Sequence, residues 1–364
     1  MATIQEQILD IEKEIRETPY HKGTEHHIGK LRARLSRLKA KEIDSQTRKG
    51  GGGGGYAVKK QGDATIVLVG PPSVGKSTLL NALTNAQSKI APYAFTTVTV
   101  IPGMMKYNHA NIQILDVPGL IEGAEEGKGR GREVLSVARG ADLLILITDV
   151  DRLDAPGRIR AALERNGIRI NKNPPNVNIE KKFRGGLAVR SNIAQDLDRE
   201  TIIEVANEFG LKNAEITIRE KLTMETLIDA FSKNRVYIPS LTVINKVDVV
   251  FPQGVHTVIP DHDPGSIQIS TEHELGLKEL RQAIFDKLNL SLIYLVKRNE
   301  EPNTNHPMVI KGKPKLGEIA KLIGTDFASD KKNAKIWGQG AKYPGQTVSL
   351  NHIATENLQI LFTS

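Results

Sequence analysis

The sequence contains no cysteine, so disulfide bonds, cysteine-ligated zinc and thiol nucleophiles are all excluded, as is typical of a cytosolic protein. Aromatic residues make up only 4% of the chain, so its cores must be built from aliphatic side chains. No segment approaches the roughly 20 apolar residues that span a bilayer, and Met1 to Asp10 contains no long apolar run typical of a signal peptide. These absences predict a soluble cytoplasmic protein without membrane insertion.

The rest of the composition allows several domains and favours a polyanionic partner. The chain has 364 residues, which is enough for two to four domains, and 39% of them are hydrophobic. The formal net charge is +8. A basic excess suggests RNA, a ribosome or an acidic membrane as partner, although many proteins with other partners are also mildly basic.

Residues 1–49 predict two helices. In each part, apolar residues recur at spacings of three and four, which places them on one stripe of a helix. The first stripe consists of Ile4, Ile8, Ile11 and Ile15, and the second of Ile28, Leu31, Leu35 and Leu38. Because Pro19 to Thr24 breaks the pattern between them, we expect a helical hairpin whose stripes face each other.

The other faces of the second predicted helix are basic. They form either a surface for RNA or a protein partner, or an ordinary solvated face, and the sequence favours neither. The residues concerned are Lys30, Arg32, Arg34, Arg37, Lys39 and Lys41. The glycine run Gly50 to Gly55 that follows has no side chains to pack, so it predicts a flexible joint or a tight loop.

From Thr65 onward, short apolar strands alternate with helices. Nearly continuous apolar strands of this kind indicate a parallel sheet covered on both faces, and hence an α/β fold. A helix is expected over 77–84, and the strands are expected over 65–69, 112–115, 142–149, 241–244 and 266–269.

Two further parts interrupt or follow this rhythm. Residues 151–239 predict an inserted α+β subdomain, with helices over 155–166 and 193–209 and short strands over 188–189 and 215–218. Residues 292–364 predict a small α+β module, with a helix over 316–323 and strands over 292–296, 308–310, 334–337 and 358–362. The predicted domains are therefore a hairpin and linker (1–55), an α/β domain (56–150 and 240–290), the insertion (151–239) and a C-terminal module (291–364).

The segment from Gly70 to Ser77 fits the phosphate-loop pattern G-x-x-x-x-G-K-[ST], and it lies between a predicted strand and a predicted helix, as that motif requires. Glycines let the backbone wrap closely and point N–H groups at phosphate oxygens, and the helix N-terminus adds its positive dipole end. Lys76 is expected to reach the β- and γ-phosphates and Ser77 to ligate Mg²⁺. The predicted nucleotide-binding residues here are Pro72, Ser73, Val74, Gly75, Lys76, Ser77 and Thr78.

Asp116 begins the sequence D-V-P-G at the end of the next predicted core strand. Its carboxylate is expected to hold Mg²⁺, directly or through water, and the N–H of Gly119 to meet the γ-phosphate. Upstream, a switch threonine should complete the magnesium shell when γ-phosphate is present. We favour Thr97, although Thr96 is a close alternative, and either threonine is also compatible with an ordinary strand. The predicted metal ligands are thus Ser77, Thr97 and Asp116, and the predicted catalytic residues Lys76, Thr97 and Gly119.

The motif Asn245-Lys246-Val247-Asp248 follows another predicted core strand. Asp248 can accept hydrogen bonds from the N1–H and the exocyclic amine of guanine, whereas adenine would leave the carboxylate unpaired. The aliphatic stem of Lys246 can lie along the base, and Asn245 can tie this loop to the phosphate loop. Backbone N–H groups at Ser270 and Thr271 are expected to contact the guanine carbonyl. The three motifs in this order indicate GTP and GDP rather than ATP.

With these motifs in place, the chain resembles the developmentally regulated GTP-binding (DRG) proteins, which are related to the Obg GTPases. The resemblance covers essentially the whole chain and rests on the segments 24–29, 95–97, 116–124, 127–131 and 234–239. It implies a ribosomal-protein-like insertion, a ubiquitin-like TGS domain at the C-terminus, an association with translation and the ribosome, and a regulatory protein partner. It also raises K⁺ as a second cofactor, a point left open because Ser73 stands where potassium-activated relatives carry asparagine.

Leu120 follows Gly119 where other GTPases carry a glutamine that orients water, so we expect slow intrinsic hydrolysis of GTP to GDP and phosphate. Arg130 and Arg132 can either stabilise transition-state charge or contact RNA or solvent. The leading hypothesis is a GTP-hydrolysing switch that acts in translation through ribosome or tRNA association. The alternatives are an RNA-binding assembly protein in which the nucleotide is mainly structural, and a P-loop kinase or ATPase, against which Asp248 argues.

Overall fold

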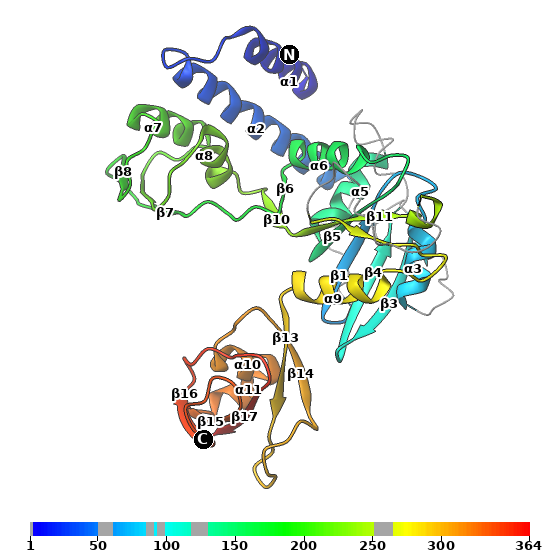
Figure 1. Cartoon of the computed structure of the whole chain (residues 1–364). Coiled ribbons are helices and arrows are strands. Elements are labelled where there is room, and N and C mark those ends of the chain that lie inside the picture. Colours follow the sequence, from blue (N-terminus) through cyan, green and yellow to red (C-terminus); the bar gives the residue numbers. More distant parts are fainter. Residues whose placement is uncertain (1–2, 50–60, 85–90, 93–98, 118–129, 251–264) are drawn as a thin grey trace. The chain divides into compact units, whose positions relative to one another are not determined.

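The computed structural model describes residues 3–49, 61–84, 91–92, 99–117, 130–250 and 265–364. The chain divides into two compact units (Figure 1). Unit 1 consists of residues 1–56 and 164–237, and unit 2 of residues 57–163 and 238–364. The predicted insertion therefore shares a unit with the hairpin, whereas its first helix, α6 (Ala155–Arg165), lies mostly in unit 2.

A seven-stranded sheet forms the centre of unit 2, in the strand order β12-β11-β5-β1-β4-β3-β2 (Figure 1). Strands β12, β11, β5, β1 and β4 run parallel, as their apolar sequences predict, whereas β3 and β2 add an antiparallel edge. The strands are β1 (Ala64–Val69), β2 (Ala91–Pro92), β3 (Thr99–Tyr107), β4 (Ala110–Asp116), β5 (Leu143–Asp149), β11 (Ser240–Asn245) and β12 (Ile267–Gln268).

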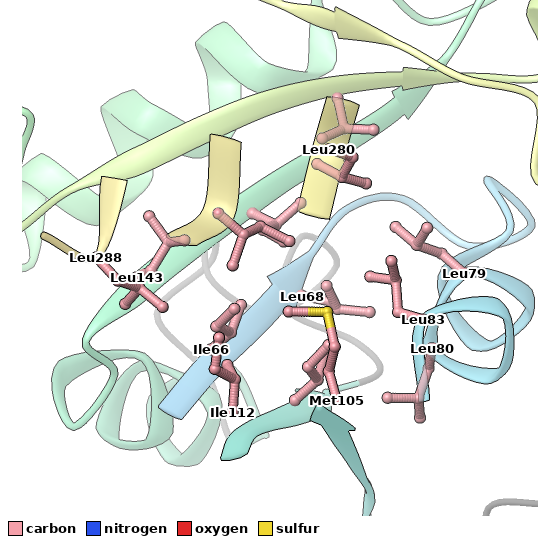
Figure 2. Packing of buried hydrophobic residues seen from close by; sticks show 14 of the residues in the cluster. Ile66, Leu68, Leu79, Leu80, Leu83, Met105, Ile112, Leu143, Leu280 and Leu288 are labelled. Atoms are coloured by element: carbon pink, nitrogen blue, oxygen red, sulfur yellow. The ribbon is translucent and has the colours of Figure 1, made fainter. Parts of the chain in front are cut away.

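The sheet of unit 2 is buried on both faces. Every residue of β1 and β5 is buried, so neither strand alternates between polar and apolar residues. On one face, Ile66, Leu68 and Leu143 form a common core with residues of α3 (Lys76–Thr84) and α9 (Leu277–Lys287) (Figure 2). The core is mainly aliphatic, as the scarcity of aromatic residues predicts, and Phe285 is its buried aromatic residue. Unit 2 also contains α5 (Arg130–Arg139) and the short helix η1 (Val247–Val249).

The edge strand β3 was not predicted, because Pro102 and Gly103 lie in its middle and resemble a turn. Gly103 fits there for a packing reason: a Cβ atom would lie 2.8 Å from Leu80 Cδ1 and 2.6 Å from Thr84 Cγ2 of helix α3. The glycine therefore lets α3 approach the strand closely. Pro102 is tolerated because β3 belongs to the antiparallel edge of the sheet.

Unit 1 contains the predicted hairpin, which packs on a small α+β layer. Helix α1 (Ile4–Glu17) contacts α2 (Glu25–Lys49), and α2 also packs along α7 (Arg199–Glu208) and α8 (Met224–Phe231). Ala33 of α2 is fully buried in a core with residues of these two helices. A three-stranded sheet in the order β7-β9-β8 backs them, and β6 pairs with β10. The strands are β6 (Ile168–Ile170), β7 (Val177–Lys181), β8 (Leu187–Ser191), β9 (Ala214–Ile218) and β10 (Val236–Ile238).

The structure corrects one prediction for unit 1 and adds elements that the sequence did not predict. The helix predicted from Ile193 begins only at Arg199, with Asp198 at its N-cap position. The polar stretch from Asn171 to Phe183 contains strand β7, and helix α8 was not predicted at all. The basic face of α2 is also less free than its sequence suggests. Three of its cations lie within 4 Å of acidic side chains, namely Lys30 with Glu204, Arg37 with Glu208 and Lys39 with Glu12.

The C-terminal module is a five-stranded mixed sheet in the order β14-β13-β17-β15-β16. Leu316, Ile319 and Ala320 on one face of α10 are fully buried against the sheet, as the predicted helix over 316–323 requires. Its elements are β13 (Leu290–Leu295), β14 (Pro307–Lys311), α10 (Leu316–Ile323), α11 (Thr325–Ser329), β15 (Asn333–Trp337), β16 (Gln346–Ser349) and β17 (Leu358–Thr363). Within the described part of the whole chain, none of the helices combines the length and the apolarity needed to cross a membrane.

Candidate nucleotide site

The loop from Gly70 to Gly75 joins β1 to α3 at the carboxyl end of the parallel strands, and two of its glycines are required by close contacts. A Cβ atom on Gly70 would lie 2.2 Å from the carbonyl oxygen of Ile147. Gly75 has φ +90°, and a Cβ atom there would lie 2.4 Å from Asn245 Nδ2. The backbone of this loop therefore follows a path that only glycine allows at both ends.

Three consecutive carbonyl groups of the loop are held by side chains from elsewhere in unit 2. The carbonyl oxygen of Pro72 accepts from Arg152 Nη1 at 2.9 Å, that of Ser73 from Lys246 Nζ at 2.7 Å, and that of Val74 from Asn245 Nδ2 at 2.8 Å. In a trans peptide, the N–H of the next residue points opposite to the carbonyl. The N–H groups of residues 73–75 thus point away from these side chains, and such a run of oriented N–H groups suits a phosphate group.

Lys76 begins helix α3, and its ammonium group is bound by the same loop. Nζ donates to the carbonyl oxygens of Gly70 at 3.1 Å and Pro71 at 2.7 Å, and the residue is only 9% exposed. A charged ammonium group forms stronger hydrogen bonds with an anion than with neutral carbonyl groups. The position beside the loop and the helix N-terminus therefore favours phosphate.

Ser77 and Asp116 lie together, as the magnesium prediction requires. Ser77 Oγ donates to Asp116 Oδ2 at 2.6 Å, and the other carboxylate oxygen, Oδ1, is buried and has no hydrogen-bond partner in the part of the chain that the structure describes. An uncompensated buried carboxylate oxygen is costly, and a cation would compensate it. Among the described residues, no three or more His, Cys, Asp or Glu side chains cluster so as to hold a metal. The hard oxygens of Ser77 and Asp116 fit Mg²⁺, which takes few protein ligands and keeps several waters.

Asn245 connects three segments at the end of β11. Besides donating to the phosphate loop, it accepts through Oδ1 from the backbone N–H of Thr271 at 3.1 Å and from Thr271 Oγ1 at 2.8 Å. Asn245 is 2% exposed, so all these bonds are shielded from water. The predicted link between the guanine motif and the phosphate loop is present in the structure.

The carboxylate of Asp248 is positioned to accept hydrogen bonds. Its Oδ1 is buried without a partner, and Oδ2 lies 3.9 Å from His273 Nε2. Lys246, just before it, has the left-handed backbone angle φ +60°, which turns the chain so that its side chain reaches Ser73 and lies 3.5 Å from Asp149. The motif thus combines a carboxylate oxygen of Asp248 that has no partner among the described residues with a lysine side chain bound to the phosphate loop.

The prediction for Ser270 and Thr271 needs a correction. The N–H of Ser270 donates to the carbonyl oxygen of Leu275, and the N–H of Thr271 donates to Asn245 Oδ1. Both groups that were expected to contact the guanine carbonyl therefore already have acceptors within the protein. Ser270 and Thr271 instead brace the loop between β12 and α9, because Ser270 Oγ also accepts from the N–H of His273 at 3.3 Å.

Sequence analysis missed a pair that supports this site, Asp149 at the end of β5 and Arg152. Arg152 donates from Nε to Asp149 Oδ1 at 3.1 Å and from Nη2 to Oδ2 at 2.6 Å, while its third nitrogen binds Pro72. Hydrogen bonding by Arg152 lowers the pKa of Asp149 below its ordinary value. A carboxylate directly after a buried strand was the available signal, but Asp151 and Asp154 are equally good partners for Arg152 by sequence.

Several predicted residues lie outside this geometry. Thr96, Thr97, Gly119 and Leu120 are not among the described residues, and the side chains of Arg130 and Arg132 in α5 are not described either. Thr78 lies exposed in the first turn of α3, one residue beyond Ser77. The described part of the site is thus the phosphate loop, the Ser77–Asp116 pair and the guanine motif with its supports.

The parallel sheet, the glycine-bounded loop before α3 and the Asn-Lys-x-Asp motif define a P-loop GTPase domain. A family model described as a 50S ribosome-binding GTPase matches residues 65–181, and a model for the C-terminal region of that domain matches residues 184–290. Among solved structures, the cytosolic domain of L. pneumophila FeoB matches 61% of this chain and 69% of its own, with 16% identity and a TM-score of 0.34.

Relatives of known sequence match over almost the whole chain. An uncharacterized GTP-binding protein of Methanocaldococcus jannaschii is 43% identical over 96% of this chain and 90% of its own length. Developmentally-regulated GTP-binding protein 2 of Homo sapiens is 38% identical over 96% of both chains, and developmentally-regulated G-protein 3 of Arabidopsis thaliana is 39% identical over 97% and 96%. The chain belongs to the family of developmentally regulated GTP-binding proteins.

Proposed function

We propose that this protein hydrolyses GTP to GDP and phosphate, with Mg²⁺ at Ser77 and Asp116, and acts as a nucleotide-controlled switch in translation in the cytoplasm. The observation that carries the GTP assignment is the buried Asp248 Oδ1, which has no hydrogen-bond partner among the described residues. Guanine supplies two donors, its N1–H and its exocyclic amine, for such a carboxylate, whereas adenine supplies an acceptor at N1 and no amine at C2.

In this proposal, each residue of the site has a separate task. The N–H groups of the phosphate loop and the ammonium of Lys76 bind and orient the β- and γ-phosphates. Ser77 and Asp116 would hold Mg²⁺, which would supply positive charge to offset the charge that develops on the phosphate. Thr97 is proposed to contact the metal, and Gly119 the γ-phosphate. Both residues belong to segments that follow the phosphate loop in the sequence. Because Leu120 cannot orient water, the attacking water depends on a group from a partner or a cation.

The first prediction concerns base specificity. Asp248→Asn replaces one carboxylate oxygen by an N–H donor, so it should lower GTP affinity at least about 100-fold. Xanthine has a carbonyl where guanine has the amine, so the same variant should bind XTP better than the unaltered protein does. Fluorescent nucleotide titration measures both affinities. The matched control is Asp154→Asn, whose carboxylate is 69% exposed, and it should leave both affinities unchanged.

The second prediction concerns hydrolysis. Single-turnover hydrolysis by the isolated protein should be slow, on the order of 10⁻⁴ to 10⁻² s⁻¹, as for GTPases that lack an activating group. Replacing Na⁺ by K⁺ tests whether the Ser73 hydroxyl, placed where potassium-activated relatives carry asparagine, still supports stimulation by that ion. Fast hydrolysis without K⁺ or any partner would contradict the proposed dependence on an external group.

A role at the ribosome is supported by three features. The chain carries a net charge of +8, residues 65–181 match a family model whose description is a 50S ribosome-binding GTPase, and the C-terminal module has a mixed sheet with one packed helix. We propose that this module is a TGS domain and that ribosomal or transfer RNA is the partner. A regulatory protein that binds near Thr97 and Gly119 would supply the group that orients the attacking water.

The experiment that tests this role is co-sedimentation with ribosomes. The protein is loaded with GDP or with a non-hydrolysable GTP analogue, and a chain that ends before Leu292 is compared with the full chain. Stronger binding with the analogue and weaker binding after truncation would support a ribosome-directed switch. Binding that ignores the nucleotide would favour the RNA-binding assembly protein, and no binding would overturn the proposed ribosomal partner.

A further inference from the structure

The loop of residues 182–186 joins β7 to β8 in the small sheet of unit 1, and it carries an aromatic residue at its tip. Phe183 has a relative exposure of 106%, so its ring touches no other part of the described protein. A single exposed apolar residue is common on protein surfaces, so the conformation of the loop and the charges beside the ring decide whether Phe183 has a binding role.

Hydrogen bonds at its base hold the 182–186 loop in a defined conformation. Asn213, in the turn before β9, accepts through its backbone oxygen from the N–H of Lys182 at 3.0 Å and through Oδ1 from the N–H of Gly186 at 2.9 Å. The N–H of Ala214 donates back to the Gly186 oxygen at 3.1 Å. Gly185 and Gly186 have φ +111° and +75°, which makes the turn possible at low cost. The base of the loop is therefore tied on both sides, and Phe183 is presented at a defined place.

Exposed cations flank Phe183 in the sequence and lie in the turn that holds the loop. Lys181, Arg184 and Lys212 are exposed and form no ion pair within the described residues, and Lys212 directly precedes the Asn213 that holds the loop. Lys182 is bound to Glu215, which also pairs with Arg190 at 3.0 Å. Glu180 is the other acidic group nearby, and it lies across from Glu215 on the outer face of the sheet. The tip itself thus carries an aromatic ring and unpaired positive charge.

We propose that the 182–186 loop binds single-stranded RNA, with the Phe183 ring stacked on an unpaired base and Lys181, Arg184 and Lys212 near the phosphates. This inference rests on the proposed RNA-directed function and assigns one contact to it. A base has an aromatic face and a negatively charged backbone, so it complements both features of the tip at once, and stacking tolerates any sequence.

The loop fits a membrane or an apolar protein groove less well. Its other residues are cations and glycines, and Ile193, another exposed apolar residue of unit 1, follows the opposite end of β8. One aromatic side chain buries too little apolar area for stable membrane binding, which generally needs a second anchor. The combination of one ring with several cations is instead the composition of a single-stranded nucleic acid site.

The test measures binding of the full chain to a fluorescently labelled oligouridylate by anisotropy. Phe183→Leu keeps an apolar side chain but removes the aromatic face, and it should weaken binding by about five- to a hundredfold, the range that one lost base stack produces. Phe183→Trp should bind at least as tightly as the unaltered chain. Arg184→Gln should reduce the slope of log affinity against log salt by about 0.7. The matched control is Tyr20→Leu, at an aromatic residue of unit 1 that is 59% exposed, and it should change nothing.

Because the Phe183 ring contacts no other described residue, its variants should retain the thermal unfolding midpoint and GDP affinity of the unaltered chain. Equal binding by Phe183→Leu, absence of any oligouridylate binding, or Phe183-dependent binding to phosphatidylserine vesicles instead of RNA would each overturn the inference. Failure of this contact can be told apart from failure of the proposed function. If Phe183→Leu binds oligouridylate as the unaltered chain does, while co-sedimentation with ribosomes still depends on the nucleotide, the contact is wrong and the proposed function stands.

Discussion

At the residue scale, the phosphate loop depends on side chains that do not belong to its motif. Arg152, Lys246 and Asn245 each bind one carbonyl group of the loop, and Asp149 fixes the first two of these side chains. Because the same peptide groups carry the N–H groups of the loop, fixing the carbonyl groups also orients these donors, and such preorganisation favours phosphate binding. The site therefore extends beyond the residues that its sequence motifs identify.

The Asp149–Arg152 pair yields the third prediction. Arg152→Ala removes the partner of a carboxylate that is 2% exposed and leaves the Pro72 carbonyl without its donor. The free energy of unfolding of unit 2 should fall by about 1–3 kcal/mol, and GDP should bind more weakly. Urea denaturation and GDP titration measure these changes. Arg158→Ala is the control, because Arg158 pairs with Asp154 on the exposed side of α6 and should cost less than about 0.5 kcal/mol.

The same pair also predicts a dependence on pH. The pKa of Asp149 is lowered from its ordinary 3.8 by the hydrogen bonds from Arg152. A carboxylate with a lowered pKa contributes stability above its unfolded pKa and loses it as the pH falls through the lower folded value. The stability difference between the unaltered chain and Asp149→Asn should thus be constant at neutral pH and shrink below about pH 3.8. A difference that grows in acid would contradict this assignment.

At the element scale, short capping sequences decide where helices begin in unit 1. Helix α8 starts at a capping box, in which Thr223 Oγ1 accepts from the N–H of Thr226 at 3.3 Å and Thr226 Oγ1 accepts from the N–H of Thr223 at 2.9 Å. Helix α7 has Asp198 at the equivalent position without a side-chain cap. Both helices bury one apolar face in the same core, but only one of them has its first turn closed by side chains.

The fourth prediction follows from this difference. Thr223→Ala should lower the free energy of unfolding of unit 1 by about 1 kcal/mol, because the N–H of Thr226 loses its acceptor. Asp198→Ala should cost less, since the side chain there makes no cap bond and its ion pair, with Lys22 at 3.3 Å, is exposed. Amide hydrogen exchange in α7 and α8 measures both changes. Equal costs for the two variants would contradict the capping argument.

Elements whose sequences carry a strong hydrophobic pattern were predictable. Elements whose conformation depends on pairing with a neighbouring strand were not. Strands β1 and β5 are buried throughout, so their sequences are unambiguous. Strand β7, in contrast, alternates exposed polar residues with half-buried ones, and it exists because it pairs with β9 across five residues. Strand β3 contains proline and glycine and is likewise held by its neighbour β4. Pairing of this kind depends on residues far away in sequence, so local pattern cannot reveal it.

At the scale of the whole molecule, the chain leaves one compact unit and returns to it. Unit 2 contains residues 57–163 and 238–364, whereas unit 1 is formed by the N-terminal hairpin and the segment between them. Each unit has its own aliphatic core, with Ile216 fully buried in that of unit 1 and Ile145 in that of unit 2. Ligand binding to unit 2 therefore stabilises that unit directly.

The fifth prediction uses these separate cores. Ile216→Ala should cost about 2–5 kcal/mol and accelerate amide hydrogen exchange in unit 1, because it leaves a cavity in that core. Ile145→Ala should do the same in unit 2 and also weaken GDP binding. Saturating GDP should slow exchange in unit 2 and leave unit 1 unchanged, since a ligand stabilises the region that binds it. Uniform protection of both units by GDP would falsify this separation.

The sequence by itself determined the P-loop GTPase class, the order of its motifs and the helical hairpin. These follow from local chemistry: glycines at fixed spacing before Lys76, an acidic residue in Asn-Lys-x-Asp, and apolar residues at helical spacing. Only the tertiary structure decided that Arg152 and Asp149 support the phosphate loop, and that the N–H groups of Ser270 and Thr271 donate within the protein. It also decided that the Phe183 ring contacts no other described residue. Those facts depend on which distant residues meet, which no local pattern encodes.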